Sequence, residues 1–308
     1  MFALQSIAPA MYGQSSPQKS LRIGVLTAAR RSSASMSIER GLQLGAAEAN
    51  QTALLFGNDI QLFESPASTD AVTSARKLLS QRKVQIIIAS SADDADALSA
   101  LAEREHVLFL NVASRSPALR AACRRNTFHI EASESTYSAA ASFAAQSAAV
   151  RAPGSAPTPR VDSTVLWSPT LERYGASQIN QRFHARYGSG MDGSAWAGWA
   201  AVKIISESFL RAQSSDAWKL IAYLQSPGTS FDGHKGWPLS FRTADHQLRQ
   251  PLYVATRDSP GARVETIRDV PELRGSGSAG AVGGGAQLNA VLDRITPLMP
   301  AGGCGRAR

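Results

Sequence analysis

The sequence predicts an α/β protein built on a doubly wound parallel sheet. Between residues 21 and 133, short runs rich in Val, Ile and Leu alternate four times with helical patterns, which is typical of βαβ units. The chain of 308 residues is long enough for two domains, and its hydrophobic content of 44% is ordinary for a protein with buried cores. We therefore expect right-handed crossovers and helices on both faces of the sheet.

The expected strands are short apolar runs bounded by polar or small residues, as in strands that are buried on both faces. They are 21–26 (LRIGVL), 59–65 (DIQLFES), 84–91 (VQIIIASS), 107–113 (VLFLNVA) and 127–132 (TFHIEA). Three segments between them, 37–50, 68–81 and 93–106, carry apolar residues at steps of three and four, so each should be an amphipathic helix. We expect the first strand to lie inside the sheet, between the second and the third.

The pattern changes after the fifth strand. Ser133 can cap an Ala-rich helix over 133–149, and the next residues, 150–164, are rich in Pro, Ser and Arg and indicate an irregular linker. A βαβ unit needs ~30 residues, so this linker cannot hold one. Further helices are expected at 169–187, 194–211 and 216–225, with Trp196 and Trp199 on one buried face.

The segment 231–255, FDGHKGWPLSFRTADHQLRQPLYVA, joins a glycine-containing turn to two short strands, 239–241 and 252–255. From residue 271 the chain becomes rich in Gly, Ser and Pro, and we expect mobile chain there with one isolated helical turn at 288–295.

The segment 231–255 and the block that begins at Trp167, WSPTLERYGASQINQRFHARYGSGMDGSAWAGWAAVKIISESFLRA, resemble type I periplasmic solute-binding proteins. These form the leucine/isoleucine/valine-receptor family of ABC transporters. Within it, the chain is most similar to the branch associated with quinone (PQQ)-dependent alcohol dehydrogenase systems. Relative to the family, the central strands and helices of the second lobe are missing.

The resemblance implies a division into a complete first lobe and a truncated second lobe. The expected parts are a leader or signal remnant (1–20), the first lobe (21–133), a crossover helix and linker (134–166), the rest of the second lobe (167–257) and a Gly-rich tail (258–308).

The function implied by the resemblance is that of a periplasmic receptor without enzymatic activity. It would bind a small organic solute, amino acid-like or derived from a short organic acid or alcohol, in the cleft between its lobes. It would deliver this solute to an ABC transporter permease and meet the membrane only through that partner. The alternative is a shortened relative that has lost transport and acts as an interaction or regulatory module, or has no function.

The candidate site follows from topology, because open parallel sheets bind ligands beyond the carboxyl ends of their strands. The loops there are 27–31, 90–93 and 113–116. The resemblance implies that hydroxyl and backbone groups of the loops after the third and fourth strands hold the carboxylate and amine of the solute. The matching residues, which could instead only cap helices, are Ser90, Ser91, Ala113 and Ser114, with Thr27 added from the first loop. We expect Ser90 and Ser114 at the loop surface. Arg30 and Arg31 could meet an anionic ligand or face solvent.

Other functions find little support. The five histidines lack the spacing of a zinc site, and none accompanies a recognisable nucleophile elbow. The string GSGSAG at 275–280 matches a dinucleotide fingerprint, but neither a strand before it nor a helix after it is expected. We therefore expect no enzymatic activity, no cofactor and no metal.

Charge and cysteine content complete the picture. The net charge of +8 comes from scattered basic residues, which argues against nucleic-acid binding. No run approaches the ~20 apolar residues of a membrane span. The first residues, MFALQSIAPAMYGQ, could be the tail of a secretion signal or a disordered leader. Cys123 and Cys304 could form a disulfide if the protein is exported, or remain two unpaired thiols.

Overall fold

The computed structural model describes residues 19–65, 70–151, 161–258, 261–266, 289–290, 292–293 and 304. The predictions for the leader, for most of the linker and for most of the Gly-rich tail lie outside the described residues.

A five-stranded parallel sheet forms the centre of the molecule, in the order β2-β1-β3-β4-β5. Its strands are β1 (Lys19–Leu26), β2 (Asn58–Ser65), β3 (Ile86–Ala89), β4 (Leu108–Asn111) and β5 (Thr127–His129). Ile23 pairs with Leu62 on one side and with Ile86 on the other. The predicted fold class and the interior position of the first strand are confirmed.

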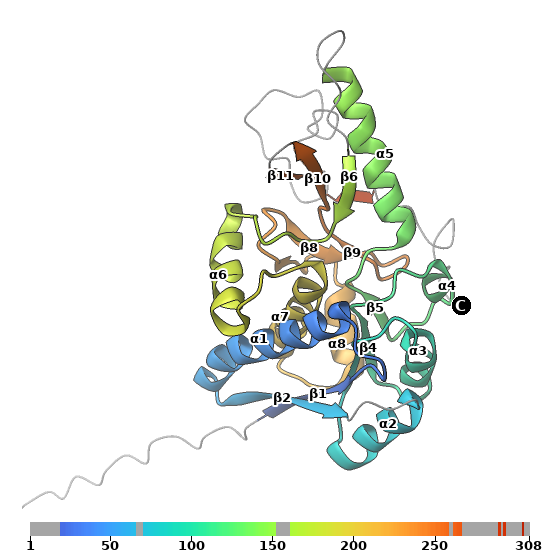
Figure 1. The fold of residues 1–308 in the computed structure, drawn as a ribbon. Helices are drawn as coiled ribbons and strands as arrows, with labels where there is room; N and C mark the ends of the chain where they lie inside the picture. Colours follow the sequence, from blue (N-terminus) through green and yellow to red (C-terminus); the bar gives the residue numbers. More distant parts are fainter. Residues whose placement is uncertain are drawn as a thin grey trace, which may run out of the picture.

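Helices cover both faces of this sheet, as Figure 1 shows. One face meets α1 (Ser33–Leu55) and α7 (Gly193–Ala212) through residues such as Ile23, Ile88 and Leu110. The other face, with Ile87 and Phe109, meets the helical segments between β2 and β5. These are α2 (Ala71–Lys77), a π-helical turn η1 (Leu78–Arg82), α3 (Ala95–Arg104) and α4 (Pro117–Ala121). Neighbouring residues of one strand therefore serve two cores, which explains the nearly continuous apolar runs.

Helices α1 and α7 approach each other through glycine. A Cβ atom added at Gly41 would lie 1.9 Å from the carbonyl oxygen of Ala195, and one added at Gly198 would lie 2.4 Å from that of Ile38. The backbones thus come closer than any side chain would allow at these positions, and this contact joins the second half of the chain to the first.

Replacing Gly41 with Ala is expected to lower the free energy of unfolding by about 1 to 3 kcal/mol, because the added methyl group forces the two helices apart. Urea denaturation measures the change. Gly228→Ala is the matched control, since a Cβ there meets nothing within 4 Å. Equal stability of the two variants would contradict the close contact.

The helices after residue 167 share one hydrophobic core with α1 and the five-stranded sheet, although the sequence places 167–257 in the second lobe. Trp196 and Trp199 of α7 share one core with α1 and the sheet, and they are buried as predicted. The other elements of this group are a 3₁₀ turn η2 (Arg173–Gly175), α6 (Ala176–Tyr187) and α8 (Ala217–Gln225). Helix α6 packs against α1, and α8 packs against α7 and β8, and a pattern along one chain segment does not reveal these partners.

A smaller unit stands apart from the five-stranded sheet, with α5 (Glu134–Arg151) rising from the end of β5 (Figure 1). Its antiparallel sheet has the order β11-β10-β6. The strands are β6 (Val161–Val165), β10 (Tyr253–Asp258) and β11 (Gly261–Thr266). The sequence predicted a linker up to residue 164, but VDSTV forms β6 because β10 supplies its pairing partner.

The third sheet is also small, and through it the chain comes back to the edge strand β5. It consists of β7 (Phe231–Asp232), β8 (Pro238–Phe241) and β9 (Leu248–Arg249). The backbone N–H of His129 donates to the carbonyl oxygen of His246 at 2.9 Å. Near the end of the chain, Asp293 accepts from the Arg249 side chain at 2.9 Å, and Cys304 forms a disulfide with Cys123. The described residues of the C-terminal segment are therefore attached to the body.

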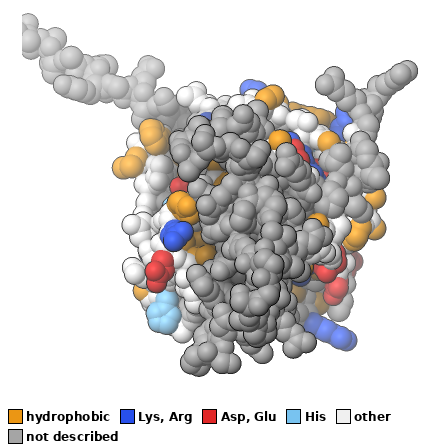
Figure 2. Space-filling view, turned by 90° about the horizontal axis from the view of Figure 1, so that it is seen from above, with side chains coloured by type: hydrophobic (Ala, Val, Ile, Leu, Met, Phe, Trp, Pro, Cys, Tyr) orange, Lys and Arg blue, Asp and Glu red, His pale blue; other side chains and the backbone are white. Residues whose placement is uncertain are grey.

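On the face seen in Figure 2, the described residues show single Lys and Arg side chains scattered among Asp and Glu side chains. Among the helices of the described chain, none combines the length and the apolar character needed to cross a membrane.

Candidate functional site

The carboxyl ends of β1, β3, β4 and β5 lie side by side along one edge of the sheet, because these strands are parallel neighbours. The loops that follow the first three of them hold the five binding residues predicted from the sequence: Thr27, Ser90, Ser91, Ala113 and Ser114. Adjacent strands are ~4.8 Å apart, so the fold gathers these residues at one edge. Their role in ligand binding stays a prediction.

Ser90 and Ser114 are buried, with 2% and 4% of their surface exposed, contrary to the expected surface position. The hydroxyl of Ser90 donates to Glu39 Oε1 and accepts from the backbone N–H of Ala28, both at 3.0 Å. Ser90 thereby ties β3 to α1 and to the loop after β1. Because its hydroxyl is occupied, we expect Ser90 to support the loops and not to contact a solute.

Thr27, Ser91 and Ala113 are half-buried and therefore reach the surface of the same loops. The hydroxyl of Ser91 accepts from the N–H of Asp93 at 3.1 Å, which is a local turn bond of the capping kind. Of the two arginines in the first loop, Arg30 is exposed and Arg31 forms an ion pair with Glu39. A solute at this edge would meet these groups first.

Arg120 supports the loop after β4 from below and is only 1% exposed. Its guanidinium donates to the carbonyl oxygens of Ser114, Ser116 and Glu131 and to the side chain of Gln247. Burial lowers its pKa to about 10, and the charge of Glu131 opposes this shift. These four bonds fix the loops after β4 and β5 relative to each other.

Glu131 follows β5 and is 4% exposed. It accepts from the Tyr137 hydroxyl at 2.6 Å and from the N–H of Ala132 at 3.0 Å, and Arg115 lies 3.6 Å away. Burial raises the pKa of Glu131 above its ordinary value, whereas the bond from Tyr137 and the charges of Arg115 and Arg120 act in the opposite direction.

Because the folded-state pKa of Glu131 is raised, its contribution to stability is fully present below the ordinary value of 4.5 and is lost as the pH rises through the raised pKa. The stability of the wild type relative to Glu131→Gln should therefore fall from pH 4.5 upward. Denaturation curves of both proteins over this range measure the difference. Glu134→Gln is the control and should show no such trend, because this carboxylate lies three residues later at the start of α5 and is 63% exposed. A difference that does not change with pH would contradict the raised pKa.

Lys235 lies where the five-stranded sheet is connected to the sheet β11-β10-β6, and it is fully buried. Its Nζ donates to the carbonyl oxygens of Leu166 and Pro251 at 2.8 and 3.1 Å and to Gln250 Oε1 at 2.8 Å. Gln250 in turn donates to the carbonyl oxygen of Ile130 at 2.6 Å. Three chain segments join the five-stranded sheet to the unit of α5, β6 and β10, and we call them the crossings. They contain Leu166, Pro251 and Ile130. One lysine and one glutamine therefore bind all three crossings together.

Burial lowers the pKa of Lys235 well below its usual value, and the charge of Glu131 opposes this shift. The face of Trp196 lies 3.9 Å from Nζ and stabilises a cation at this position. The three acceptors match the three N–H groups of an ammonium ion.

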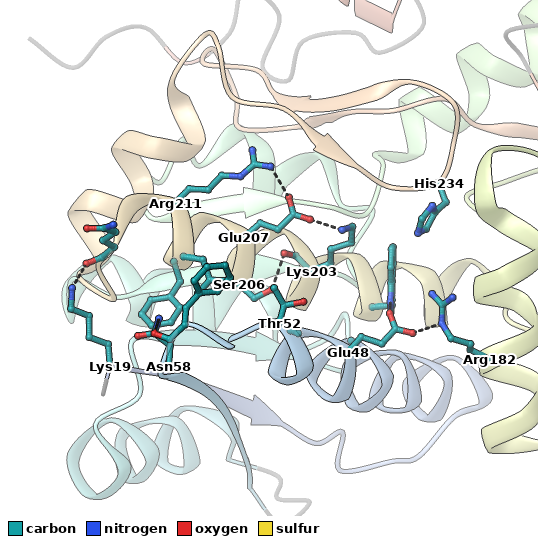
Figure 3. A pocket seen from close by; sticks show the side chains of 17 residues that line it. Lys19, Glu48, Thr52, Asn58, Arg182, Lys203, Ser206, Glu207, Arg211 and His234 are labelled. Atoms are coloured by element: carbon teal, nitrogen blue, oxygen red, sulfur yellow. Dashed lines mark hydrogen bonds and ion pairs between the residues drawn. The ribbon is translucent and has the colours of Figure 1, made fainter. Parts of the chain in front are cut away.

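A pocket of about 880 Å³ lies at the other end of the sheet, near the amino ends of β1 and β2 (Figure 3). Its charged side chains largely satisfy one another, as Glu207 pairs with Lys203 and with Arg211. Glu48 likewise accepts from Arg182 and from the Trp199 ring N–H. Because open parallel sheets bind ligands at their carboxyl ends, we place the candidate site at the opposite edge.

Sequence reasoning missed the charged groups around the candidate loops. Glu131 had a recognisable signal, since a carboxylate directly follows the apolar run that precedes it. Arg115 also lies inside a loop that was singled out. Lys235 and Arg120 could not be found, because their partners are distant in sequence. The described residues contain no cluster of three metal-ligating side chains.

Residues 20–155 match the family model described as periplasmic binding protein, which is somewhat less than half of the chain. No curated protein matches the chain.

Solved structures share the fold. An ABC-type branched-chain amino acid transporter protein from Rhodopseudomonas palustris CGA009 is 14% identical, with a TM-score of 0.66 over 80% of this chain and 96% of that one. A branched-chain amino acid transporter substrate-binding protein from Streptococcus pneumoniae, in complex with isoleucine, is 14% identical (TM-score 0.62; 80% and 99%). A solute-binding protein of an ABC transporter from Rhodopseudomonas palustris BisB5, in complex with 3,4-dihydroxybenzoic acid, is 11% identical (TM-score 0.62; 82% and 99%).

The chain therefore has the fold of type I periplasmic binding proteins, and at these identities the likeness shows the fold alone. The aligned region spans nearly the whole of each relative, and the missing central segment of the second lobe stays a prediction.

Proposed function

We propose that the protein is the substrate-binding component of an ABC transporter, which binds a small organic solute at the carboxyl ends of the strands. The observation that carries this proposal is the gathering of four loops at one sheet edge, directly beside three segments that cross to a second unit. Such an arrangement suits a receptor that closes two lobes around a ligand.

The comparisons support a class of solute. Structural relatives hold isoleucine or 3,4-dihydroxybenzoic acid, so an amino acid or an organic acid is the first expectation for this chain. The permease of the transporter is the proposed partner and the periplasm the proposed location, both supported by the match over residues 20–155. The branch beside PQQ-dependent alcohol dehydrogenase systems rests on the sequence resemblance alone.

Isothermal titration of the folded protein against amino acids, aromatic and aliphatic carboxylates and short alcohols tests this proposal. We expect saturable binding to at least one carboxylate. A flat panel on folded protein would contradict the receptor and favour the alternative, a shortened relative without transport that acts as an interaction or regulatory module. The small size of the described second unit is the observation behind this alternative.

A further inference from the structure

Arg115 presents a fixed guanidinium group at the sheet edge that holds the candidate site. It follows Ser114 in the loop after β4, and its side chain is 49% exposed. The guanidinium carbon lies 4.0 Å from the centre of the Tyr137 ring. Tyr137 is itself buried and held by its hydrogen bond to Glu131. The planar group is therefore supported by a ring that cannot easily move.

The N–H groups of Arg115 remain without an acceptor among the described residues. The nearest carboxylate oxygens are Glu131 Oε1 at 3.6 Å and Glu134 Oε2 at 4.0 Å, and both distances exceed that of a hydrogen bond. Two of the other arginines at this edge have acceptors in the protein. Arg120 donates to four protein acceptors, and Arg31 is paired with Glu39. The third, Arg30, is exposed and lies in the loop after β1.

The two glutamates beside Arg115 could compete with an anionic ligand, but their placement limits this. Glu131 already accepts two hydrogen bonds and is buried, which disfavours its charged form. The side chain of Glu134 is 63% exposed, where water screens its charge. Both carboxylates are placed to orient the guanidinium without occupying its N–H groups.

We propose that Arg115 is a specificity-determining residue, whose fork of N–H groups binds the carboxylate of the solute. This rests on the proposed function, because it concerns the same site. A guanidinium matches a carboxylate in two parallel hydrogen bonds, and support by Tyr137 means that little side-chain freedom is lost on binding. The neutral amide of the same acid presents an NH₂ group in place of one oxygen, so it should bind poorly.

The experiment compares two acids with their amides by isothermal titration: isoleucine with isoleucinamide, and 4-hydroxybenzoate with 4-hydroxybenzamide. The wild type should bind at least one acid roughly tenfold or more tightly than its amide, the range of a hydrogen bond to a charged group. Arg115→Met should weaken binding of the acid by a similar factor and leave the amide unchanged. Arg115→Lys, which keeps the charge but loses the fork, should lie between them.

Arg104→Met is the control, since Arg104 is exposed at the end of α3. Melting curves establish that all variants are folded. If acid and amide bind equally, or if Arg115→Met binds the acid as tightly as the wild type, the role of Arg115 is refuted while the receptor function stands. If none of the four probes binds to the folded wild type, the role of Arg115 falls as well, and a flat response across the wider solute panel refutes the receptor separately.

Discussion

Replacing Cys123 and Cys304 together with Ser is expected to destabilise the oxidised protein strongly. The disulfide joins residues that are 181 apart in sequence, and a closed loop of this size contributes about 5 kcal/mol in the chain-entropy description. The loss should come close to this figure without exceeding it. Leu292 and Asp293 still hold the tail against the body when the disulfide is absent. Denaturation by guanidinium under non-reducing conditions measures the loss.

Reduction of the wild-type protein should reproduce the stability of the double Ser variant, and reductant should leave that variant unchanged. Mass spectrometry after non-reducing digestion identifies the linked peptides directly. Two alkylated thiols in protein isolated from the periplasm would end the disulfide account, whatever the stability of the variant.

Replacing Lys235 with Met is the second change expected to have a large effect. It leaves the carbonyl oxygens of Leu166 and Pro251 and the side chain of Gln250 without their donor in a buried place. A buried unsatisfied polar group costs about 1 to 3 kcal/mol, and the removal of a desolvated charge offsets part of the total. We expect a net loss of about 3 kcal/mol in the free energy of unfolding.

Lys219→Met is the matched control, because Lys219 is exposed on α8 and its change should cost little. Lys235→Met should also loosen the three crossings, which hydrogen exchange of the amides around Leu166, Pro251 and Ile130 can detect. A variant that is as stable and as protected as Lys219→Met would show that the crossings do not depend on Lys235.

The first half of the fold could be predicted because its signals are local. Each parallel strand is buried on both faces, so runs such as LRIGVL and VQIIIASS stand out against amphipathic helices. The polar run VDSTV shows the limit of this reasoning. It forms β6 only because β10, about 90 residues later, pairs with it. Likewise, the docking of α7 on α1 depends on Gly41 and Gly198, whose proximity no single segment displays.

The sequence predicted the loops of the candidate site but not the contacts inside them. Topology and resemblance identified the loops that contain Ser90, Ser91 and Ser114. The roles inside these loops depend on distant partners. The Ser90 hydroxyl, expected to bind the solute, donates instead to Glu39, which is 51 residues earlier in the chain. This bond supports the loops. Arg115 acquires its orientation from Tyr137 and Glu131 in the same way.

Hydrogen exchange of the protein with and without its strongest ligand from the titration panel tests the location of the site most directly. Binding at the carboxyl ends of the strands should protect the amides of 27–32, 90–94, 112–116 and 131–134. The amides that line the pocket between α1 and α7, around Glu48 and Lys203, should be unchanged. Protection confined to that pocket, with the four loops unaffected, would contradict the account.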